Sequence, residues 1–332
     1  MNEETILEVQ HLSKSYGPFE AVKDVSFSVG RGQVLGFLGP NGAGKTTIMK
    51  ILTGFHFPTA GTALVEGLSV EDYPLEVKRR IGYLPENVPV YGELSVEEYL
   101  GFIADARKIG KAEREGRMDK AIEACGLGDF RKRRIETLSK GYRQRTGLAQ
   151  AIMHDPSILI LDEPTTGLDP NQIIEIRSLI TELGKSKTVI LSTHIMQEVE
   201  AMCSNVLILN EGRIAAQGTP AEISETLRGG NTWALTIKST DALRAGVGAG
   251  LALPFNGASE GAITETNVNN VYNLTITMPR SENEADEMAQ AEQISDWAVG
   301  KGYKILGMRQ NRLSLEDIFV KLTGDDKEAG ND

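Results

Sequence analysis

A glycine-rich segment between a strand pattern and a helix pattern constrains the fold of this chain more than any other feature. Residues 33–38 are strand-like and mostly apolar, and helical spacing begins after residue 44. The segment satisfies the pattern G-x-x-x-x-G-K-S/T, with Gly39, Pro40, Asn41, Gly42, Ala43, Gly44, Lys45 and Thr46. Glycines let backbone N–H groups approach phosphate oxygens, and a helix N-terminus attracts anions. We therefore expect the triphosphate of a nucleotide to bind here.

Side chains that follow the glycines have expected roles of their own at the phosphates. The Lys45 ammonium is expected to bridge the β- and γ-phosphates, and the Thr46 hydroxyl is expected to ligate Mg²⁺. Thr47 is a further candidate for nucleotide contact. A chance glycine-rich turn is the alternative, and it is disfavoured because the strand and helix patterns stand on the required sides.

A second apolar strand ends in two neighbouring carboxylates. Residues 158–161 are Ile-Leu-Ile-Leu, and Asp162 and Glu163 follow them. Ligands of open α/β sheets bind at the carboxyl ends of strands. We expect Asp162 to hold Mg²⁺, directly or through water, and Glu163 to polarise the water that attacks the γ-phosphate. With the glycine-rich segment, this pair predicts an ATPase or a GTPase, and the missing guanine-selecting pattern N/T-K-x-D favours ATP.

Short β-branched runs alternate with helical patterns through residue 218, which predicts a parallel sheet flanked by helices. From Ser95 to about Asp155 the pattern is helical throughout, with a capping box at Ser95 and Glu98 and a stop at Pro156. We therefore expect a helical subdomain over about residues 90–155. Strands are expected at residues 6–9, 21–29, 33–38, 62–65, 81–84, 158–161, 188–191 and 206–209.

The composition changes at residues 228–230, Arg-Gly-Gly, where we expect a linker to a second domain. Beyond it we expect strands at residues 231–238 and 271–278, a helix from 284 to about 300 and a last helix from 314 to about 322. Residues 245–252 fit a loop or a poorly formed helix. The patterns predict domains at residues 1–228 and 229–322, the second a small α+β domain of the ferredoxin-like kind, and a polar tail at residues 323–332.

Charge and hydropathy exclude several classes of protein. The 332 residues carry a formal net charge of −11, the wrong sign for binding nucleic acid through phosphate neutralisation, so we expect no nucleic-acid partner. No apolar run is long enough to cross a bilayer. The first ten residues are acidic and lack the pattern of a secretory signal, so we expect a cytoplasmic protein. Two cysteines are too few for a disulfide framework or a metal site.

These motifs, and several more in the same order, resemble those of the ATP-binding-cassette (ABC) ATPases over about residues 5–225. The resemblance implies a P-loop fold with a RecA-like core, an N-terminal antiparallel β subdomain and a helical subdomain. It implies ATP and Mg²⁺ as cofactors. It also implies that Tyr16 stacks on adenine, which is physically reasonable for an aromatic ring.

The signature motif of that family has a counterpart with two departures. Leu138-Ser139-Lys140-Gly141-Tyr142 stands where the family has LSGGQ, just before a helical pattern. The resemblance implies that Ser139 and the Gly141 backbone face a γ-phosphate from a helix N-terminus. Lys140 and Tyr142 replace Gly and Gln. Taken alone, this segment would be a turn and a helix cap.

Three further residues match positions that the family uses around the nucleotide. Asp169, in Thr-Gly-Leu-Asp, corresponds to the D-loop, and Asp169-Pro170 is also a good helix start. His194 follows a predicted strand and corresponds to the switch histidine, which reaches the γ-phosphate and holds Glu163 with its water. Glu86 stands where the family usually has Gln, and its oxygen can still contact Mg²⁺ or its water.

The resemblance implies a head-to-tail dimer in which ATP on the phosphate loop of one copy is closed over by Ser139 and Gly141 of another. One set of motifs is present, so a second ATP-binding subunit is needed, either an identical copy or a paralogue. ATP closes the dimer, and hydrolysis reopens it. Separate integral-membrane permease subunits are implied, docked near the helical subdomain and residues 86–93, on the cytoplasmic face of the cell membrane.

The particular residues in these motifs indicate a subgroup of the ABC ATPases. Ile-Gly-Tyr-Leu-Pro-Glu at residues 81–86, Leu-Ser-Lys-Gly-Tyr-Arg-Gln-Arg at 138–145 and a carboxyl-terminal domain ending near residue 324 resemble the ATP-binding subunits of ABC-2-type exporters, including gliding-motility and multidrug types. A soluble regulatory ABC ATPase without a transport partner stays open. Ribosome-acting relatives normally carry two cassettes, and chromosome-organising relatives need long heptad repeats; this sequence has neither.

Overall fold

The computed structural model describes residues 4–226, 231–238, 259–266, 271–279 and 284–311. The chain forms two compact units, one including Met1–Ile223 and the other spanning Ser224–Ile318. The expected boundary after residue 228, the undecided stretch 245–252, the helix expected at 314–322 and the polar tail all lie outside the described residues.

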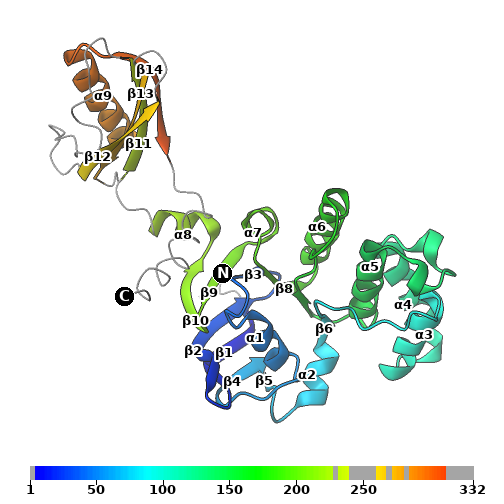
Figure 1. The fold of residues 1–332 in the computed structure, drawn as a ribbon. Coiled ribbons are helices and arrows are strands. Elements are labelled where there is room, and N and C mark those ends of the chain that lie inside the picture. The colour runs from blue at the N-terminus through cyan, green and yellow to red at the C-terminus, as the bar shows by residue number, and fades with distance from the viewer. Residues whose placement is uncertain (1–3, 227–230, 239–258, 267–270, 280–283, 312–332) are drawn as a thin grey trace. The chain divides into compact units, whose positions relative to one another are not determined.

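A six-stranded sheet forms the centre of the first unit (Figure 1). Its strand order is β10-β9-β3-β8-β7-β6, and all neighbours run parallel except β10, which is antiparallel to β9. The predicted parallel sheet is therefore confirmed. The strands are β3 (Val34–Leu38), β6 (Ile81–Leu84), β7 (Ile158–Asp162), β8 (Thr188–Thr193), β9 (Asn205–Asn210) and β10 (Arg213–Gly218).

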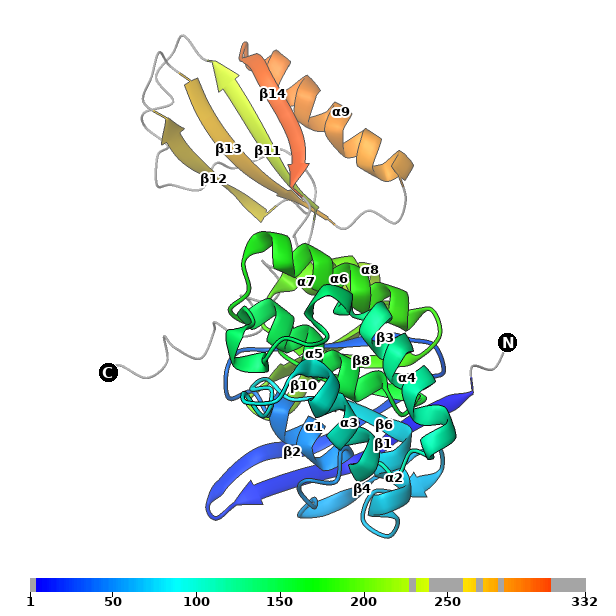
Figure 2. The same cartoon turned by 90° about the vertical axis from the view of Figure 1, so that its right-hand side faces the viewer.

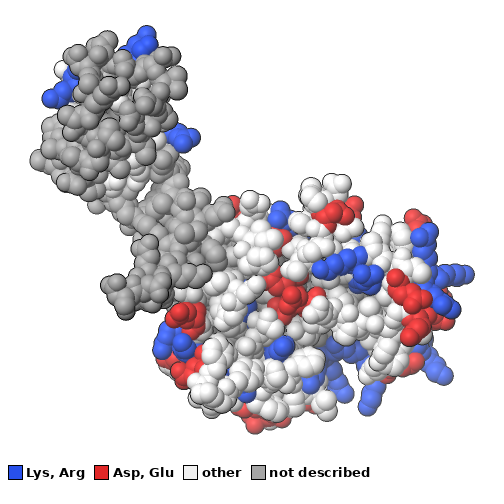
Figure 3. Space-filling model, viewed as in Figure 1, with Lys and Arg blue, Asp and Glu red and all other residues white. Residues whose placement is uncertain are grey.

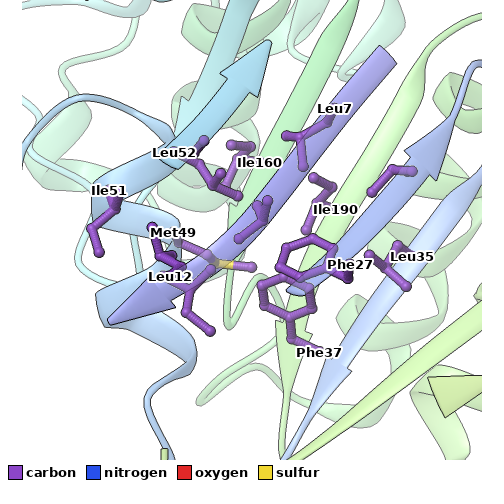
Figure 4. Close-up of a cluster of buried hydrophobic side chains, with 14 of the residues drawn as sticks. Leu7, Leu12, Phe27, Leu35, Phe37, Met49, Ile51, Leu52, Ile160 and Ile190 are labelled. Carbon is purple, nitrogen blue, oxygen red and sulfur yellow. The ribbon is translucent and has the colours of Figure 1, made fainter. Parts of the chain in front are cut away.

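An antiparallel sheet of order β2-β1-β4-β5 lies against this core through a shared apolar interior (Figure 4). Phe27 on one sheet and Phe37 on the other meet edge to face, with ring centroids 5.4 Å apart. Met49, from the helix between the sheets, is fully buried beside them. Its strands are β1 (Thr5–Tyr16), β2 (Phe19–Gly30), β4 (Ala60–Val65) and β5 (Leu68–Ser69).

Helices connect the strands of the first unit. Helix α1 (Lys45–Leu52) follows the glycine-rich segment directly, as predicted, and contacts both sheets. Helices α6 and α7 pack against each other, and both contact β8. The connecting helices other than α1 have 7 to 15 residues. Their bounds are α2 (Pro74–Arg80), α6 (Pro170–Gly184), α7 (Met196–Met202) and α8 (Pro220–Thr226).

The predicted helical subdomain contains α3 (Val96–Ala106), α4 (Lys111–Ala124) and α5 (Lys140–Ile152), which gather at one end of the unit (Figures 1 and 2). The capping box at the start of α3 is present. The prediction of helix throughout is wrong for residues 125–139, which hold only two short 3₁₀ turns, Gly128–Phe130 and Ile135–Thr137. Gly126, with φ +63°, ends α4 in a left-handed conformation that breaks the helix.

The second unit is an antiparallel sheet of order β12-β13-β11-β14 with α9 between β13 and β14 along the chain. Because β13 lies between β11 and β12, and β11 lies between β13 and β14, the described strands fit the split arrangement of a ferredoxin-like domain. Two strands, β12 and β14, were not predicted. The elements are β11 (Asn231–Lys238), β12 (Ser259–Thr266), β13 (Val271–Met278), α9 (Glu284–Gly300) and β14 (Lys304–Asn311).

Within the residues that the structure describes, no helix is both long and apolar enough to span a membrane. Cys125 and Cys203 are buried free thiols. Burial raises the pKa of each to about 12, so neither is a reactive thiolate.

Candidate functional site

The glycine-rich loop has little room for side chains. A Cβ at Gly39 would come within 2.4 Å of the Leu209 carbonyl oxygen, and one at Gly44 within 2.7 Å of the Ala21 carbonyl oxygen. Gly44 also has φ +103°, which only glycine adopts readily. The loop therefore needs glycine at both positions, and it ends at the N-terminus of α1, where backbone N–H groups are free to bind an anion.

The Lys45 side chain folds back along the loop, where carbonyl oxygens of the loop backbone bind its ammonium group. Its Nζ donates hydrogen bonds to the carbonyl oxygens of Gly39, at 2.6 Å, and Pro40, at 3.2 Å, and lies 3.7 Å from Glu163 Oε1. Burial lowers the pKa of the ammonium, and the carboxylates of Glu163 and Asp162 oppose that shift. A lysine held in this way is ready to bind phosphate oxygens as a point charge.

Asp162 lies at the carboxyl end of β7, within reach of the phosphate loop. Its Oδ1 accepts hydrogen bonds from Thr46 Oγ1, at 3.2 Å, and from Ser192 Oγ, at 2.5 Å. Glu86, a residue from a different loop, lines a cavity together with Thr46 and Glu163. Hydroxyl and carboxylate oxygens are the donors that Mg²⁺ prefers, so Thr46, Asp162 and Glu86 fit the ion, which would take its other ligands from phosphates and water. The described residues hold no cluster of three metal-ligating side chains.

Glu163 and His194 form a close pair beside Asp162. His194 Nδ1 lies 2.9 Å from Glu163 Oε2, and the same oxygen accepts a hydrogen bond from Thr166 Oγ1 at 3.1 Å. The Glu163 backbone has φ +48°, a left-handed conformation that few residues other than glycine adopt, and its N–H donates to Ser192 Oγ. The expected neighbourhood of Glu163 and His194 is thus present, and Thr166 and Ser192 are contacts that sequence reasoning missed.

A cavity of about 230 Å³ brings most of the expected nucleotide contacts together. Tyr16, 43% exposed, stands on its wall, with the His56 ring edge-on at 5.9 Å and Lys14 Nζ over the Tyr16 ring at 5.2 Å. Phe19, 61% exposed, lines the cavity too and was not predicted; its spacing of three residues from Tyr16 was the available signal. The other lining residues are Ala21, Asn41, Gly42, Ala43, Gly44, Lys45, Thr46, Thr47, Glu86 and Glu163.

Ser139, Gly141 and Asp169 belong to a second cluster and are absent from the lining of that cavity. Ser139 caps α5 and accepts a hydrogen bond from the Tyr142 amide at 3.4 Å. Asp169 caps α6, and its Oδ1 accepts a hydrogen bond from the backbone N–H of Gln172 at 2.9 Å. A Cβ at Gly141 would come within 2.7 Å of the Gln172 side chain, so the signature segment and the start of α6 are in close contact.

Lys140 and Tyr142, the two residues that differ from the family's signature motif, each contact another segment of the chain. A Cβ at Gly167 would lie 2.2 Å from Lys140 Nζ, so the lysine covers the D-loop segment of its own chain. The Tyr142 ring stacks on Phe130, with centroids 3.9 Å apart, and the Arg145 guanidinium lies 5.9 Å from its centre. Tyr142 thereby packs the signature segment against the residues that join α4 and α5.

The sheet, the phosphate loop and the paired carboxylates define a P-loop nucleotide hydrolase of the cassette type. Residues 22–166 match the ABC transporter family. The uncharacterized ABC transporter ATP-binding protein YxlF of Bacillus subtilis is 37% identical over 233 residues, which cover 70% of this chain and 77% of that protein. The linearmycin resistance ATP-binding protein LnrL of the same organism is 34% identical over 235 residues, covering 70% of this chain and 75% of that protein.

A solved structure of an ABC transporter's ATP-binding subunit superposes with a TM-score of 0.61 at 34% identity, covering 67% of this chain and 92% of that one. The chain therefore belongs to the family of ABC transporter ATP-binding proteins, and it is an ATPase. The resemblance drawn from the motifs is confirmed, as is the predicted P-loop fold with its antiparallel and helical subdomains.

Proposed function

We propose that this chain powers an ABC-2-type membrane exporter through ATP-driven closure of a dimer of cassettes. The observation that carries the proposal is the division of the site: the phosphate-loop cavity holds Tyr16, Lys45 and Glu163, whereas Ser139 and Gly141 lie outside its lining. Each chain thus has two different half-sites. A head-to-tail pair of chains would join unlike halves twice.

The side chains on the phosphate-loop half divide the chemistry among them. Lys45 and the loop N–H groups would hold the β- and γ-phosphates, and Tyr16 would stack on adenine. Glu163 would accept the proton of the attacking water, while His194, 2.9 Å from its carboxylate, would keep that carboxylate in place and reach the γ-phosphate. Mg²⁺ held by Thr46, Asp162 and Glu86 would neutralise charge that develops on the phosphates.

The signature half closes the site from the second copy. Ser139 caps α5, a helix of 13 residues, so its hydroxyl and the first N–H groups of the helix can face a γ-phosphate. Contacts to the γ-phosphate stabilise the closed dimer and are lost on hydrolysis, which lets the dimer reopen. Since both half-sites are in one chain, an identical second copy is sufficient.

A groove beside the helical subdomain fits the docking of a separate permease on the cytoplasmic face of the membrane. Its volume is about 480 Å³, and its walls include Phe55, Tyr83, Pro89 and the cations Lys78 and Arg107. Asn87 and Pro89 come from the predicted docking loop, residues 86–93. Figure 3 shows further Lys and Arg side chains among Asp and Glu at the end of the unit that α3 and α4 occupy. A partner segment with an apolar face and an acidic residue would match these walls.

Names of the relatives support export as the direction. LnrL is named for linearmycin resistance, and a probable multidrug ABC transporter ATP-binding protein of Escherichia coli, YbhF, is 37% identical over 222 residues. This chain covers only 38% of YbhF. Removal of a toxic compound is the activity these names suggest, and we extend it to this chain as part of the proposal.

Affinity purification of the tagged chain from detergent-solubilised membranes tests the permease. We expect a multi-span protein to co-purify with the wild type and to fall by about tenfold with Phe55→Ala, which removes an exposed ring from the groove wall. Phe57→Ala is the matched control, because Phe57 is 54% exposed but does not line the groove. Recovery of no multi-span protein would instead favour a soluble regulatory ATPase.

A further inference from the structure

Glu198 is a fully buried carboxylate in a helix that carries none of the expected site residues. It lies in α7 with a relative exposure of 0%. Its Oε1 accepts a hydrogen bond from Thr165 Oγ1 at 2.5 Å, and its Oε2 accepts one from Thr193 Oγ1 at 2.7 Å. Each carboxylate oxygen thus has its own hydroxyl donor, and the two donors come from different segments of the chain.

These two threonines flank the catalytic pair. Thr165 stands two residues after Glu163, in the segment between β7 and α6, and Thr193 is the residue immediately before His194, at the end of β8. The carboxylate therefore joins the backbone that carries the general base to the backbone that carries the histidine. Among the described residues, Glu198 is the side chain of α7 that hydrogen-bonds to both segments.

The charge of Glu198 has a cation beside it. Arg177 of α6 places a guanidinium nitrogen 3.6 Å from Glu198 Oε1, and the side chain of Arg177 is 24% exposed. An unpaired buried carboxylate is costly, and the arginine and the two hydroxyls together offset that cost. An apolar residue could pack at this position without the cost of burying a charge, so we take the buried carboxylate as a functional candidate.

We propose that Glu198 is a positioning residue for hydrolysis: its carboxylate ties Thr165 to Thr193 and so maintains the contact between Glu163 and His194. The inference rests on the proposed catalytic roles of Glu163 and His194. We expect Glu198 to affect the rate of the chemical step, because displacing a reacting group by about 1 Å can lower the rate about 100-fold. Nucleotide binding is left to Tyr16 and the phosphate loop.

Steady-state hydrolysis by Glu198→Gln tests this tie. Glutamine keeps the size of the side chain, but its amide nitrogen cannot accept a hydrogen bond, so one threonine loses its acceptor. We expect kcat to fall by about tenfold or more, with KM for ATP within about twofold of the wild type. Glu200→Gln is the matched control: it removes an exposed carboxylate from the same helix and leaves kcat unchanged. Wild-type kcat in Glu198→Gln would overturn the inference.

A second measurement separates positioning from a general loss of structure. If Glu198 acts through the pair, Glu198→Gln lowers the single-turnover rate by less than about twofold in a His194→Ala background, because the contact is already lost. A further tenfold loss there would overturn the inference.

Thr165→Val, which removes one hydroxyl donor and keeps the shape of the side chain, is expected to lower kcat as Glu198→Gln does. If Glu163→Gln hydrolyses ATP normally, the proposed catalytic roles fail instead, whatever Glu198 does.

Discussion

Tyr16 presents an exposed aromatic face to the phosphate-loop cavity, between Lys14 and His56. The ring is held at the end of β1, so little conformational entropy is lost when a base stacks on it. Adenine is flat and apolar on its faces, and stacking on an aromatic side chain contributes about 1–3 kcal/mol per base.

Tyr16→Ala is therefore expected to weaken ATP binding by about 5- to 150-fold, while Tyr16→Phe keeps the ring and stays close to the wild type. Titration with a fluorescent ATP analogue measures the dissociation constant. Equal affinity for the alanine variant and the wild type would mean that the adenine lies elsewhere in the cavity, with Phe19 as the first residue to test.

Glu86 places a carboxylate in the lining of the phosphate-loop cavity. We expect Glu86→Gln to keep hydrolysis, since an amide oxygen remains, and Glu86→Ala to raise the half-saturating Mg²⁺ concentration by about tenfold. Hydrolysis measured against Mg²⁺ at fixed ATP gives that concentration. An unchanged Mg²⁺ dependence in the alanine variant would remove Glu86 from the ligand set.

At the scale of single residues, the sequence predicted those parts of the site whose residues lie close together along the chain. The phosphate loop, Asp162 and Glu163 each belong to a short motif next to a strand end, so their roles can be inferred from neighbours along the chain. Ser192 and Glu198 could not be inferred in that way, because their contacts depend on how β7, β8 and α7 come together in three dimensions. Thr166 lies only three residues after Glu163, so its contact is local.

At the element scale, His154 joins the segment after α5 to strand β6. Its Nε2 donates a hydrogen bond to the Ile81 carbonyl oxygen at 3.1 Å, and its Nδ1 is buried with no hydrogen-bond partner among the described residues. Burial, aided by nearby Arg107 and Lys187, lowers the pKa of the imidazole to about 4. The helical subdomain is therefore attached to the sheet through a histidine that is neutral in the folded protein.

Stability should consequently depend on pH between about 6.5 and 4. In that window the unfolded chain binds a proton at His154 and the folded chain does not, so acid favours unfolding and stability rises with pH. The effect is about 3 kcal/mol between the two limits. Urea unfolding of the wild type and His154→Gln at several pH values checks it: the variant should lose part of this dependence, and identical pH dependence in both would contradict it.

The strands of the central sheet that were predicted are those that the sequence marks by continuous apolar runs. Strands β3, β7, β8 and β9 are buried along nearly their whole length, which gives unbroken apolar runs in the sequence. Strand β10 was missed because it alternates only between exposed and half-buried residues at the edge of the sheet. Residues 125–139 were predicted as helix from the pattern of their charged and apolar residues. The structure holds this segment by contacts with other elements: Phe130 lies against Tyr142 of α5, and Arg131 forms an ion pair with Glu97 of α3.

At the scale of the whole molecule, the two half-sites predict complementation between inactive chains. Lys45→Ala damages the phosphate-loop half and Ser139→Arg blocks the signature half, so neither variant alone should hydrolyse ATP. A mixture forms dimers in which one site combines two intact halves, and about a quarter of the wild-type rate should return in an equal mixture. Phosphate release by the mixture measures this. No recovery would mean that each chain completes its site alone.

Trapping the closed dimer tests the central claim most directly, namely that Glu163 is the base in a site shared by two chains. Light scattering after size exclusion gives the mass of Glu163→Gln with Mg²⁺ and ATP, and phosphate release gives its hydrolysis rate. We predict a mass of two chains with ATP, a mass of one chain with ADP, and hydrolysis reduced by about 100-fold or more. Hydrolysis at the wild-type rate, or a mass of one chain with ATP, would contradict the account.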